Sequence, residues 1–282
     1  MRLRKPPQKP IKKRSKPDWE LTILGCGTST GVPLLFCDCQ VCRSKNSKNH
    51  RLRSSVWLRA GGKSILIDTS TDLRQQALRE RIPRIDAILF THPHADHVSG
   101  LDEIRSFNFL QREPIPAYGN AWTVGELRKR FEYIFSPPKK IEGGGIPMIE
   151  LHEFSSETTR LEVAGLPFTP IALSHGSQEC VGYRMDSLAY VTDCNAISSA
   201  SMNRLRGLDT LVLDCLRIAP HGTHLNLERA LEIVRELKPR RSIFTHLGHD
   251  FDYPTWKKML PKGVELAYDG MKLTGKFTGE IA

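Results

Sequence analysis

The sequence has no apolar run long enough to cross a membrane. Its longest apolar stretches are the size of strands, as in "DTLVLDCL" at 209–216, whereas a spanning helix needs about 20 such residues. Residues 1–16 also lack the apolar stretch that a secretory signal requires. We therefore expect a cytoplasmic protein.

Acidic residues are absent from positions 1–16, which carry eight Lys or Arg. The 282-residue chain has a net charge of +10, but beyond these positions 33 basic residues nearly balance 31 acidic ones. This composition predicts a disordered basic tail over 1–18 and one domain over 19–282. The tail is either a solubilising extension or an electrostatic arm for RNA, DNA or an acidic membrane surface. Of these partners we expect weak contact with nucleic acid and none with a membrane.

Disulfides are not expected, because the seven cysteines are odd in number and no export signal is predicted. Cys37, Cys39 and Cys42 lie close together in "FCDCQVC", and no further cysteine occurs in the next hundred residues. A closed tetrahedral zinc site needs four ligands. The remaining cysteines lie in or beside apolar strands and are expected in the core: Cys26, Cys180, Cys194 and Cys215.

From Glu20 onward the pattern is that of an α/β protein with many strands. Hairpins are predicted around Gly61-Gly62 and between "VGYRMD" and "LAYVTD". Helices are predicted over 72–82, 122–135, 198–205 and 227–237, the last with Asn226 as N-cap. No linker separates the two strand-rich halves, so we expect a single domain.

Four metal-ligand side chains lie within six residues directly after the predicted strand "IDAILF": His92, His94, Asp96 and His97. Imidazole nitrogens bind transition metals, and a carboxylate adds a harder, charged ligand. His175, Asp193 and His246 likewise follow apolar runs directly. Alone, each could be an ordinary polar residue at a strand end. Together with the cluster they make seven ligands at one edge of a sheet, enough for two metal ions.

This set resembles the motif of the metallo-β-lactamase superfamily, His-x-His-x-Asp-His followed by distant His, Asp and His. The resemblance implies an αββα sandwich of α/β class with two divalent ions, Zn²⁺ or Mn²⁺, at the sheet edge. It assigns His92, His94 and His175 to one ion and Asp96, His97 and His246 to the other. Asp193 would bridge both.

Within that superfamily the chain looks like the PhnP-type phosphodiesterases, which carry a similar cysteine insertion and a second histidine after the last catalytic one. "LGCGTSTGVP" and "AYDGMKL" also match. This likeness implies that Cys37, Cys39, Cys42 and His249 hold a structural Zn²⁺. It also implies a homodimer.

The implied function is hydrolysis of a small phosphodiester, such as a cyclic one, by a hydroxide held between the two ions. Asp96 would orient the nucleophile. His224, in "HGTHLNLE", would protonate the leaving group, with His221 as the competing candidate.

Three other functions remain open at this point. A nuclease resembling tRNA 3′-processing enzymes is favoured by the basic tail, but the sequence shows no long arm for tRNA. A thioester hydrolase of the same superfamily would use the same metal ligands. A non-catalytic, metal-stabilised binding protein is disfavoured, because the ligand set is complete.

Overall fold

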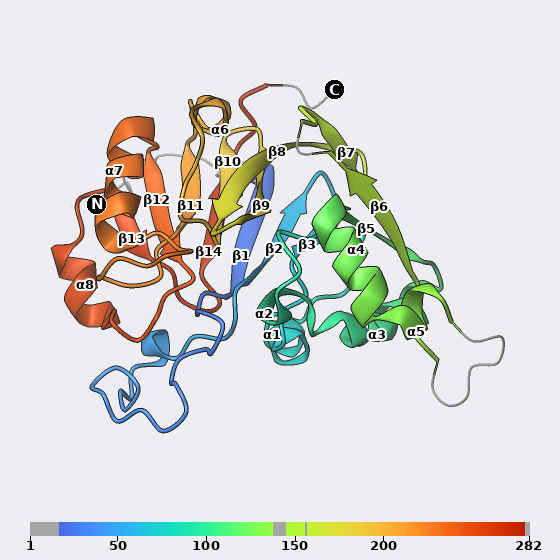
Figure 1. Ribbon diagram of the computed structural model, residues 1–282, viewed down its shortest axis with the longest axis horizontal. Helices are drawn as coiled ribbons and strands as arrows, with labels where there is room; N and C mark the ends of the chain where they lie inside the picture. The colour runs from blue at the N-terminus through green and yellow to red at the C-terminus, as the bar shows by residue number, and fades with distance from the viewer. Residues whose placement is uncertain (1–16, 138–144, 156, 280–282) are drawn as a thin grey trace, which may run out of the picture.

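The computed structural model describes residues 17–137, 145–155 and 157–279. Two sheets face each other, and helices cover their outer sides (Figure 1). The predicted αββα sandwich, a single α/β domain, is therefore confirmed. The basic tail lies outside the described residues except for Pro17 and Asp18. Among the described helices, none has the length and apolar content to cross a membrane.

The first sheet is built mainly from the N-terminal half of the chain. It pairs seven strands in this spatial order: β14 (Lys272–Gly275), β1 (Trp19–Gly25), β2 (Ser55–Ala60), β3 (Lys63–Ile67), β4 (Ala87–Leu89), β5 (Ile115–Asn120) and β6 (Ile149–Phe154). The pairs from β3 to β6 are parallel, and the others are antiparallel.

The second sheet comes from the C-terminal half. Its order is β13 (Val264–Leu266), β12 (Arg241–Thr245), β11 (Thr210–Asp214), β10 (Leu188–Val191), β9 (Gln178–Met185), β8 (Leu166–His175) and β7 (Leu161–Val163). The pairs from β10 to β13 are parallel. The carboxyl ends of parallel strands meet at one edge of a sheet, so polar residues that follow them converge there.

Helices pack on the outside of both sheets. The first sheet is covered by α1 (Leu73–Glu80), α2 (Ala95–Val98), α3 (Ile104–Gln111), α4 (Ala121–Arg130) and α5 (Glu132–Phe135). The second is covered by α6 (Ser199–Arg204), α7 (Leu227–Leu237) and α8 (Tyr253–Met259). Two short 3₁₀ turns, η1 (Ser47–Asn49) and η2 (Leu101–Glu103), lie in the connections.

Apolar side chains fill three layers, one between the sheets and one under each set of helices. The four cysteines predicted for the core, Cys26, Cys180, Cys194 and Cys215, are all fully buried. Both predicted hairpins form, β2–β3 around Gly61-Gly62 and β9–β10. Positive φ angles of 54° and 75° at Gly61 and Gly62 explain why glycine occupies that turn.

The helix predictions need two corrections. The predicted helix over 122–135 is two helices, because Phe131 has a φ of −114° and interrupts the helical backbone between α4 and α5. The helix predicted over 72–82 ends earlier, since Arg81 takes a left-handed conformation after Glu80. The helix over 227–237 is confirmed, and Asn226 caps it by accepting from the Arg229 amide.

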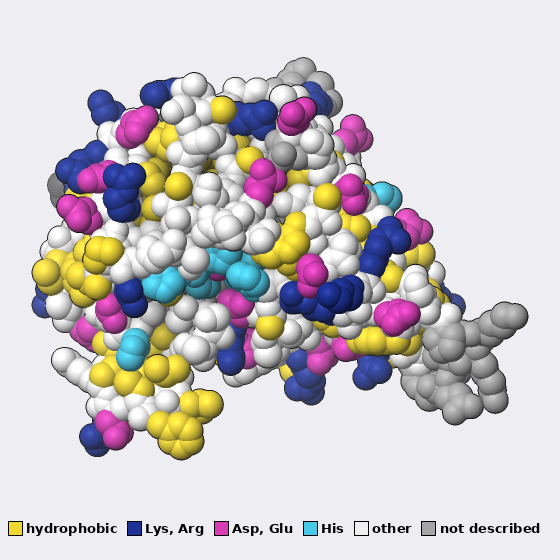
Figure 2. Space-filling view, in the orientation of Figure 1, with side chains coloured by type: hydrophobic (Ala, Val, Ile, Leu, Met, Phe, Trp, Pro, Cys, Tyr) yellow, Lys and Arg dark blue, Asp and Glu magenta, His cyan; other side chains and the backbone are white. Residues whose placement is uncertain are grey.

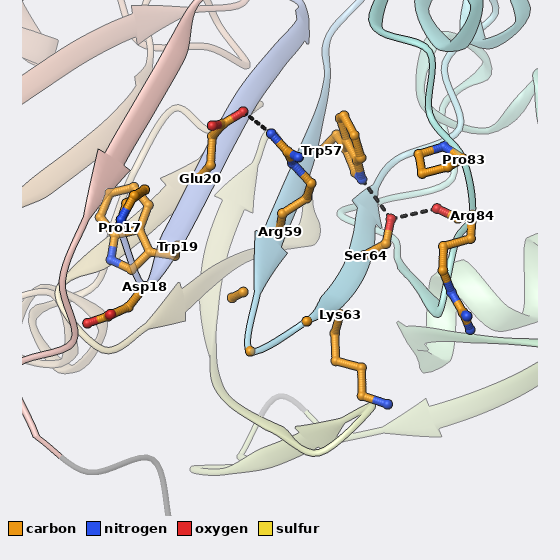
Figure 3. A pocket seen from close by; sticks show the side chains of 13 residues that line it. Pro17, Asp18, Trp19, Glu20, Trp57, Arg59, Lys63, Ser64, Pro83 and Arg84 are labelled. Atoms are coloured by element: carbon orange, nitrogen blue, oxygen red, sulfur yellow. Dashed lines mark hydrogen bonds and ion pairs between the residues drawn. The ribbon is translucent and has the colours of Figure 1, made fainter. Parts of the chain in front are cut away.

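A hollow of about 420 Å³ lies at the β2–β3 turn, at the other end of the strands from the predicted ligands (Figure 3). Several of its polar groups already have partners within the chain. Arg59 pairs with Glu20, and the Trp57 indole donates to Ser64 Oγ at 2.7 Å. None of the predicted ligands lines this hollow.

Candidate metal centres and active site

Strands of both sheets deliver polar side chains to one edge of the sandwich. The side chains at or just beyond these strand ends are Asp68 after β3, His92 after β4, His175 in β8, Asp193 after β10, Asp214 in β11 and His246 after β12. Figure 2 shows histidines gathered in the middle of the face presented there. The edge therefore combines residues from both halves of the chain, as predicted.

His92, His94 and His175 form the first ligand set. His94 Nδ1 lies 3.0 Å from His92 Nε2 and 3.3 Å from His175 Nε2. Ligand atoms about 2.1 Å from one ion, at tetrahedral to octahedral angles, lie about 3.0–3.4 Å apart. The three nitrogens thus have the spacing that a single metal ion requires.

Asp96, His97, Asp193 and His246 form the second set. His97 Nε2 lies 3.2 Å from Asp96 Oδ2 and 3.3 Å from Asp193 Oδ2. His246 Nε2 lies 3.2 Å from Asp193 Oδ1, and that same oxygen is 3.8 Å from His92 Nε2 in the first set. The Asp193 carboxylate therefore lies between the two sets, where a bridging ligand is needed.

Among the described residues, the second set has three buried nitrogens without a hydrogen-bond partner, and two of these face its own carboxylates. The two are Nε2 of His97 and Nε2 of His246, and both face the carboxylates of Asp96 and Asp193. A buried polar atom without a partner is costly. A divalent cation between these side chains would satisfy both nitrogens and offset the two negative charges, so the residues fit the metal ions that the fold implies.

The protonation states of the three histidines in the first set, and of Asp193, favour metal binding. Burial lowers the pKa of His92, His94 and His175, which keeps these imidazoles neutral and able to donate a lone pair. Burial alone would raise the pKa of Asp193, but nearby His246 and His97 outweigh it and hold that pKa well below the ordinary range. The carboxylate is therefore ionised at neutral pH.

Asp193 and His246 both have left-handed backbones, with φ of 55° and 56°, and so does Asp68, with φ of 65°. This conformation is unfavourable for residues with a side chain, by roughly 1–3 kcal/mol each, and such strain concentrates at functional sites. Asp68 and His246 directly follow a strand, and Asp193 is the second residue after one. The sharp turn directs the side chain across the sheet edge toward the ligand sets.

Asp68 is a site residue that our sequence analysis missed. Its Oδ2 lies 2.7 Å from His97 Nδ1, and its carboxylate accepts from the Thr91 amide and hydroxyl, each at 2.8 Å. A carboxylate on the outer nitrogen fixes the ring so that the other nitrogen faces the metal. The sequence pattern that could have identified Asp68 is "KSILID", in which an apolar run is followed by Asp. The run "LAYVTD", which ends at Asp193, has the same form.

His224, the residue predicted to be the proton donor, lies beside the second ligand set. Its ring stacks on His246 at 4.8 Å between centroids, and its Nδ1 is buried 3.6 Å from Asp214 Oδ2. The fully buried Asp214 also accepts from the Leu225 amide at 2.8 Å. The sequence analysis missed Asp214, which the structure places beside both His224 and His246.

His221, the competing candidate, is exposed and does not line the hollow over the ligands. The Thr223 amide donates to its Nδ1 at 3.3 Å, so it faces its own loop. That hollow measures about 330 Å³ and is lined by the following residues: Ser29, His94, Asp96, His175, Gly176, Ser177, Gln178, Asp193, Thr223, His224 and His246. Its volume suits a small substrate.

The three clustered thiols and His249 come together, as expected, at a second place. His249 Nδ1 lies 3.3 Å from Cys37 Sγ, 3.5 Å from Cys39 Sγ and 3.6 Å from Cys42 Sγ. Tetrahedral Zn²⁺ with usual bond lengths separates sulfur and nitrogen ligands by about 3.5 Å. A hydrogen bond from the Cys42 amide lowers the pKa of Cys39 to about 6, which favours the thiolate that binds zinc.

A buried arginine ties this cluster to the catalytic edge. Arg51, 1% exposed, donates to the carbonyls of Gly248 and Phe251, on either side of His249. Its own backbone pairs with Val32, in the segment 28–50 that carries the thiols and that we call the thiol loop. The thiol loop is therefore attached to the segment that follows His246 both through the ligand cluster and through Arg51.

Comparison with known proteins identifies the family to which this fold and these ligand sets belong. Residues 63–247 match the family model described as a beta-lactamase superfamily domain. A solved diphosphatase of the PhnP family is 44% identical, with a TM-score of 0.84 over 90% of this chain and 96% of that one. Zn²⁺-bound PqqB from Methylobacterium extorquens is 21% identical, with a TM-score of 0.72 over 90% and 99% of the two chains.

An octanoyltransferase from Porphyromonas gingivalis is 34% identical over 253 residues. The match covers 89% of this chain but 50% of that protein, so the chain spans about half the length of this relative. The family model and the 44% identical structure agree with the ligand geometry. The chain therefore belongs to the metallo-β-lactamase superfamily, the fold of metal-dependent hydrolases, and within it to the PhnP family.

Proposed function

We propose that this protein is a metal-dependent phosphodiesterase that hydrolyses a small, preferably cyclic, phosphodiester. The observation that carries the proposal is the placement of His224 in the wall of a small hollow, directly beside two ligand sets that share Asp193. Zn²⁺ or Mn²⁺ bound there would activate water and neutralise the charge that develops on phosphorus.

The chain's own residues then have separate tasks. Asp193 holds the two sets at a fixed separation, and Asp68 fixes the ring of His97. Asp96, which lines the hollow, orients the attacking water. His224 donates a proton to the departing oxygen, and Asp214 beside Nδ1 keeps the ring oriented.

The Cys₃His cluster supports a second part of the proposal, a structural Zn²⁺ site. Four protein ligands complete a tetrahedral shell and leave no position for substrate. Its role is to hold the thiol loop, which contributes Ser29 to the wall of the hollow, against the segment after His246. That role requires no chemistry at the zinc itself.

A diphosphate is the second candidate substrate, favoured because the 44% identical PhnP-family structure is a diphosphatase. In a diphosphate linked to two organic groups, each phosphorus carries one ester bond, one anhydride bond and a single negative charge, so it resembles the phosphorus of a phosphodiester. The same ligand sets and proton donor would serve both. Only the leaving group differs.

Purified protein loaded with Mn²⁺ or Zn²⁺ should be offered four substrates: a ribose cyclic phosphodiester, a diphosphate joining two nucleosides, a short single-stranded RNA and a thioester. ³¹P NMR would follow the phosphorus compounds and a thiol reagent the thioester. We expect metal-dependent turnover of the first or second substrate. Preferential cleavage of the RNA would indicate a nuclease, and turnover of the thioester alone would overturn the proposal.

A further inference from the structure

A tryptophan lies beside His94, the exposed member of the two ligand sets. The centroid of the Trp122 indole is 5.8 Å from that of His94, at an interplanar angle of 88°, and 6.4 Å from that of the buried His92. Neither imidazole is stacked on the indole, and Trp122 is only half-buried. Part of its ring is therefore open to solvent next to the hollow that His94 lines.

The backbone holds this ring in a fixed place. Trp122 is the second residue of α4, and Asn120 is the N-cap of that helix. The Asn120 side chain accepts from the Thr123 amide at 3.0 Å and donates to the Glu179 carbonyl at 3.2 Å. Glu179 follows Gln178, which lines the hollow. The start of α4 is thus bonded to the wall of the hollow, and a ring held in this way loses little conformational freedom when a ligand packs on it.

The α4 face that carries Trp122 has no uncompensated positive charge. Trp122, Glu126 and Arg130 follow one another at intervals of four residues, so they share one side of the helix. Arg130 pairs with Glu126 at 2.8 Å and donates to the carbonyl of Pro93, in the ligand motif, at 2.6 Å. A ligand that extends along this face would meet an aromatic surface and a closed ion pair.

The hollow itself also lacks a cation of its own. Among the described residues that line it, none is Lys or Arg, and the two acidic ones are Asp96 and Asp193, both assigned to the metal ions. Positive charge for a substrate would therefore come from the bound metals alone. This arrangement suits a single phosphodiester group and leaves no partner for additional charged phosphates.

A nucleobase matches the surface beside the hollow in shape and charge. It is planar and uncharged, and an exposed tryptophan ring stacks on bases of every kind. In a cyclic nucleotide, one ribose separates the base from the phosphorus. In this site, one imidazole, that of His94, separates Trp122 from the hollow. In Figure 2, apolar surface adjoins the histidines on the side where Figure 1 places α4.

We propose that Trp122 determines the specificity of this site by stacking on the base of a nucleotide phosphodiester whose phosphorus lies at the two ligand sets. The inference rests on the phosphodiesterase function proposed above and names its substrate class. It also assigns a preference, because a cyclic phosphodiester of ribose without a base would lack this contact and be the poorer substrate. Trp122 touches none of the reacting atoms.

Calorimetric titration of the Mn²⁺-loaded protein tests the stacking without turnover. Adenosine 3′-monophosphate and ribose 3-phosphate carry the same phosphate, but only the first carries a base. We expect wild type to bind the adenosine compound about tenfold more tightly, and Trp122→Ala to bind both equally. Trp122→Phe should keep part of the preference, because it retains an aromatic face. Tyr133→Ala, at an aromatic site 41% exposed on α5, is the matched control and should bind as wild type does.

Turnover distinguishes this inference from the function on which it rests. The substrates are adenosine 2′,3′-cyclic phosphate and the cyclic phosphate of methyl riboside, which lacks the base. Trp122→Ala should raise KM about tenfold for the first alone and leave kcat within about twofold for both. Metal content and circular dichroism of the same samples establish that the variants fold and hold their ions.

The possible failures have different meanings. If wild type cleaves neither cyclic compound, the phosphodiesterase proposal fails, while the two binding constants still report whether Trp122 stacks on a base. Equal binding of the two monophosphates by wild type, or a preference that persists in Trp122→Ala, would overturn the inference. Equal losses of turnover for both substrates in Trp122→Ala would also overturn it, since the indole would then support His92 and His94 instead of the base.

Discussion

The two ligand clusters of this chain differ in how they are built. The strand-end cluster takes seven side chains from positions 92 to 246, six of them buried, and a hollow opens above it. The thiol cluster takes three ligands from one short loop and His249 from elsewhere, and only Cys42 is buried. One is part of the core of the sandwich, and the other is attached at its edge.

This difference in construction suggests different roles: the strand-end cluster for the reaction and the thiol cluster for holding the structure. Unpartnered nitrogens, strained backbones and an adjoining cavity all occur at the strand ends. The thiol cluster has four ligands at tetrahedral spacing, and none of them lines the hollow over the strand ends. We therefore expect substitutions in the first cluster to affect turnover, and substitutions in the second to affect zinc content and stability.

The largest effect is expected from Asp193→Ala. Because this carboxylate lies between both ligand sets, its loss removes a ligand from each and one of the negative charges beside His97 and His246. Turnover should fall by at least about 1,000-fold, as when a group that stabilises transition-state charge is removed. Metal analysis should show loss of catalytic metal but retention of the zinc in the thiol cluster. Glu228→Ala, an exposed acid on α7, is the control and should change neither.

His224→Gln should produce a loss that depends on the leaving group. For an alkyl phosphodiester, whose leaving alkoxide needs a proton, we expect roughly a 100-fold loss of kcat/KM. For a p-nitrophenyl ester the leaving group is stable as an anion, and the loss should be much smaller. Equal losses on both substrates would show that His224 supports the fold or the metals instead of donating a proton.

Asp68→Asn tests the carboxylate behind His97. The amide cannot support the ring as the carboxylate does, so we expect metal affinity to fall about 10- to 100-fold. Titration of the metal-free variant with Mn²⁺ should restore most of the turnover at high metal concentration. If turnover stays low at saturating metal, Asp68 has a part in the reaction beyond holding His97.

Cys39→Ser should separate the two clusters most cleanly. We expect loss of one bound zinc, a lower melting temperature and turnover that stays within about tenfold of wild type when catalytic metal is saturating, because no reacting group is removed. Arg51 and Asn49 still hold the segment around His249 in this variant. Wild-type zinc content would contradict the assignment of Cys39 as a ligand.

The smallest effect is expected at the hollow near the β2–β3 turn. Arg59→Ala removes an exposed ion pair with Glu20 and a contact with the Trp57 ring at 4.8 Å. Exposed pairs of this kind contribute about 0.2–1 kcal/mol, so stability should change little. Turnover should not change, and a loss of activity would show that this hollow takes part in function.

The sequence predicts the site residues that belong to a local motif or follow a recognisable strand, but not those whose role depends on contacts between distant strands. His92, His94, Asp96 and His97 form a local motif, and His175, Asp193 and His246 follow apolar runs that were recognisable as strands. Asp68 and Asp214 end similar runs, but a single carboxylate at a strand end does not reveal which histidine it contacts. Their roles depend on which strands become neighbours, which is a tertiary property.

The fold shows the same contrast between features that a local sequence pattern predicts and features that it does not. The helix over 227–237 was predictable because its apolar residues recur at helical spacing and Asn226 precedes it. The interruption at Phe131 was not, since neither glycine nor proline marks it. The pairing of His249 with the thiols was expected only through the family resemblance, because more than 200 residues separate Cys42 from His249.

The most direct test asks whether the strand-end cluster carries out the reaction and the thiol cluster only supports the structure. It measures hydrolysis of bis(p-nitrophenyl) phosphate by wild type, Asp96→Ala and Cys39→Ser, with metal content determined on the same samples. The account predicts metal-dependent turnover in wild type and in Cys39→Ser, and none in Asp96→Ala. It also predicts that Cys39→Ser lacks one zinc. Turnover that survives in Asp96→Ala, or that disappears in Cys39→Ser while its catalytic metal remains bound, would contradict the account.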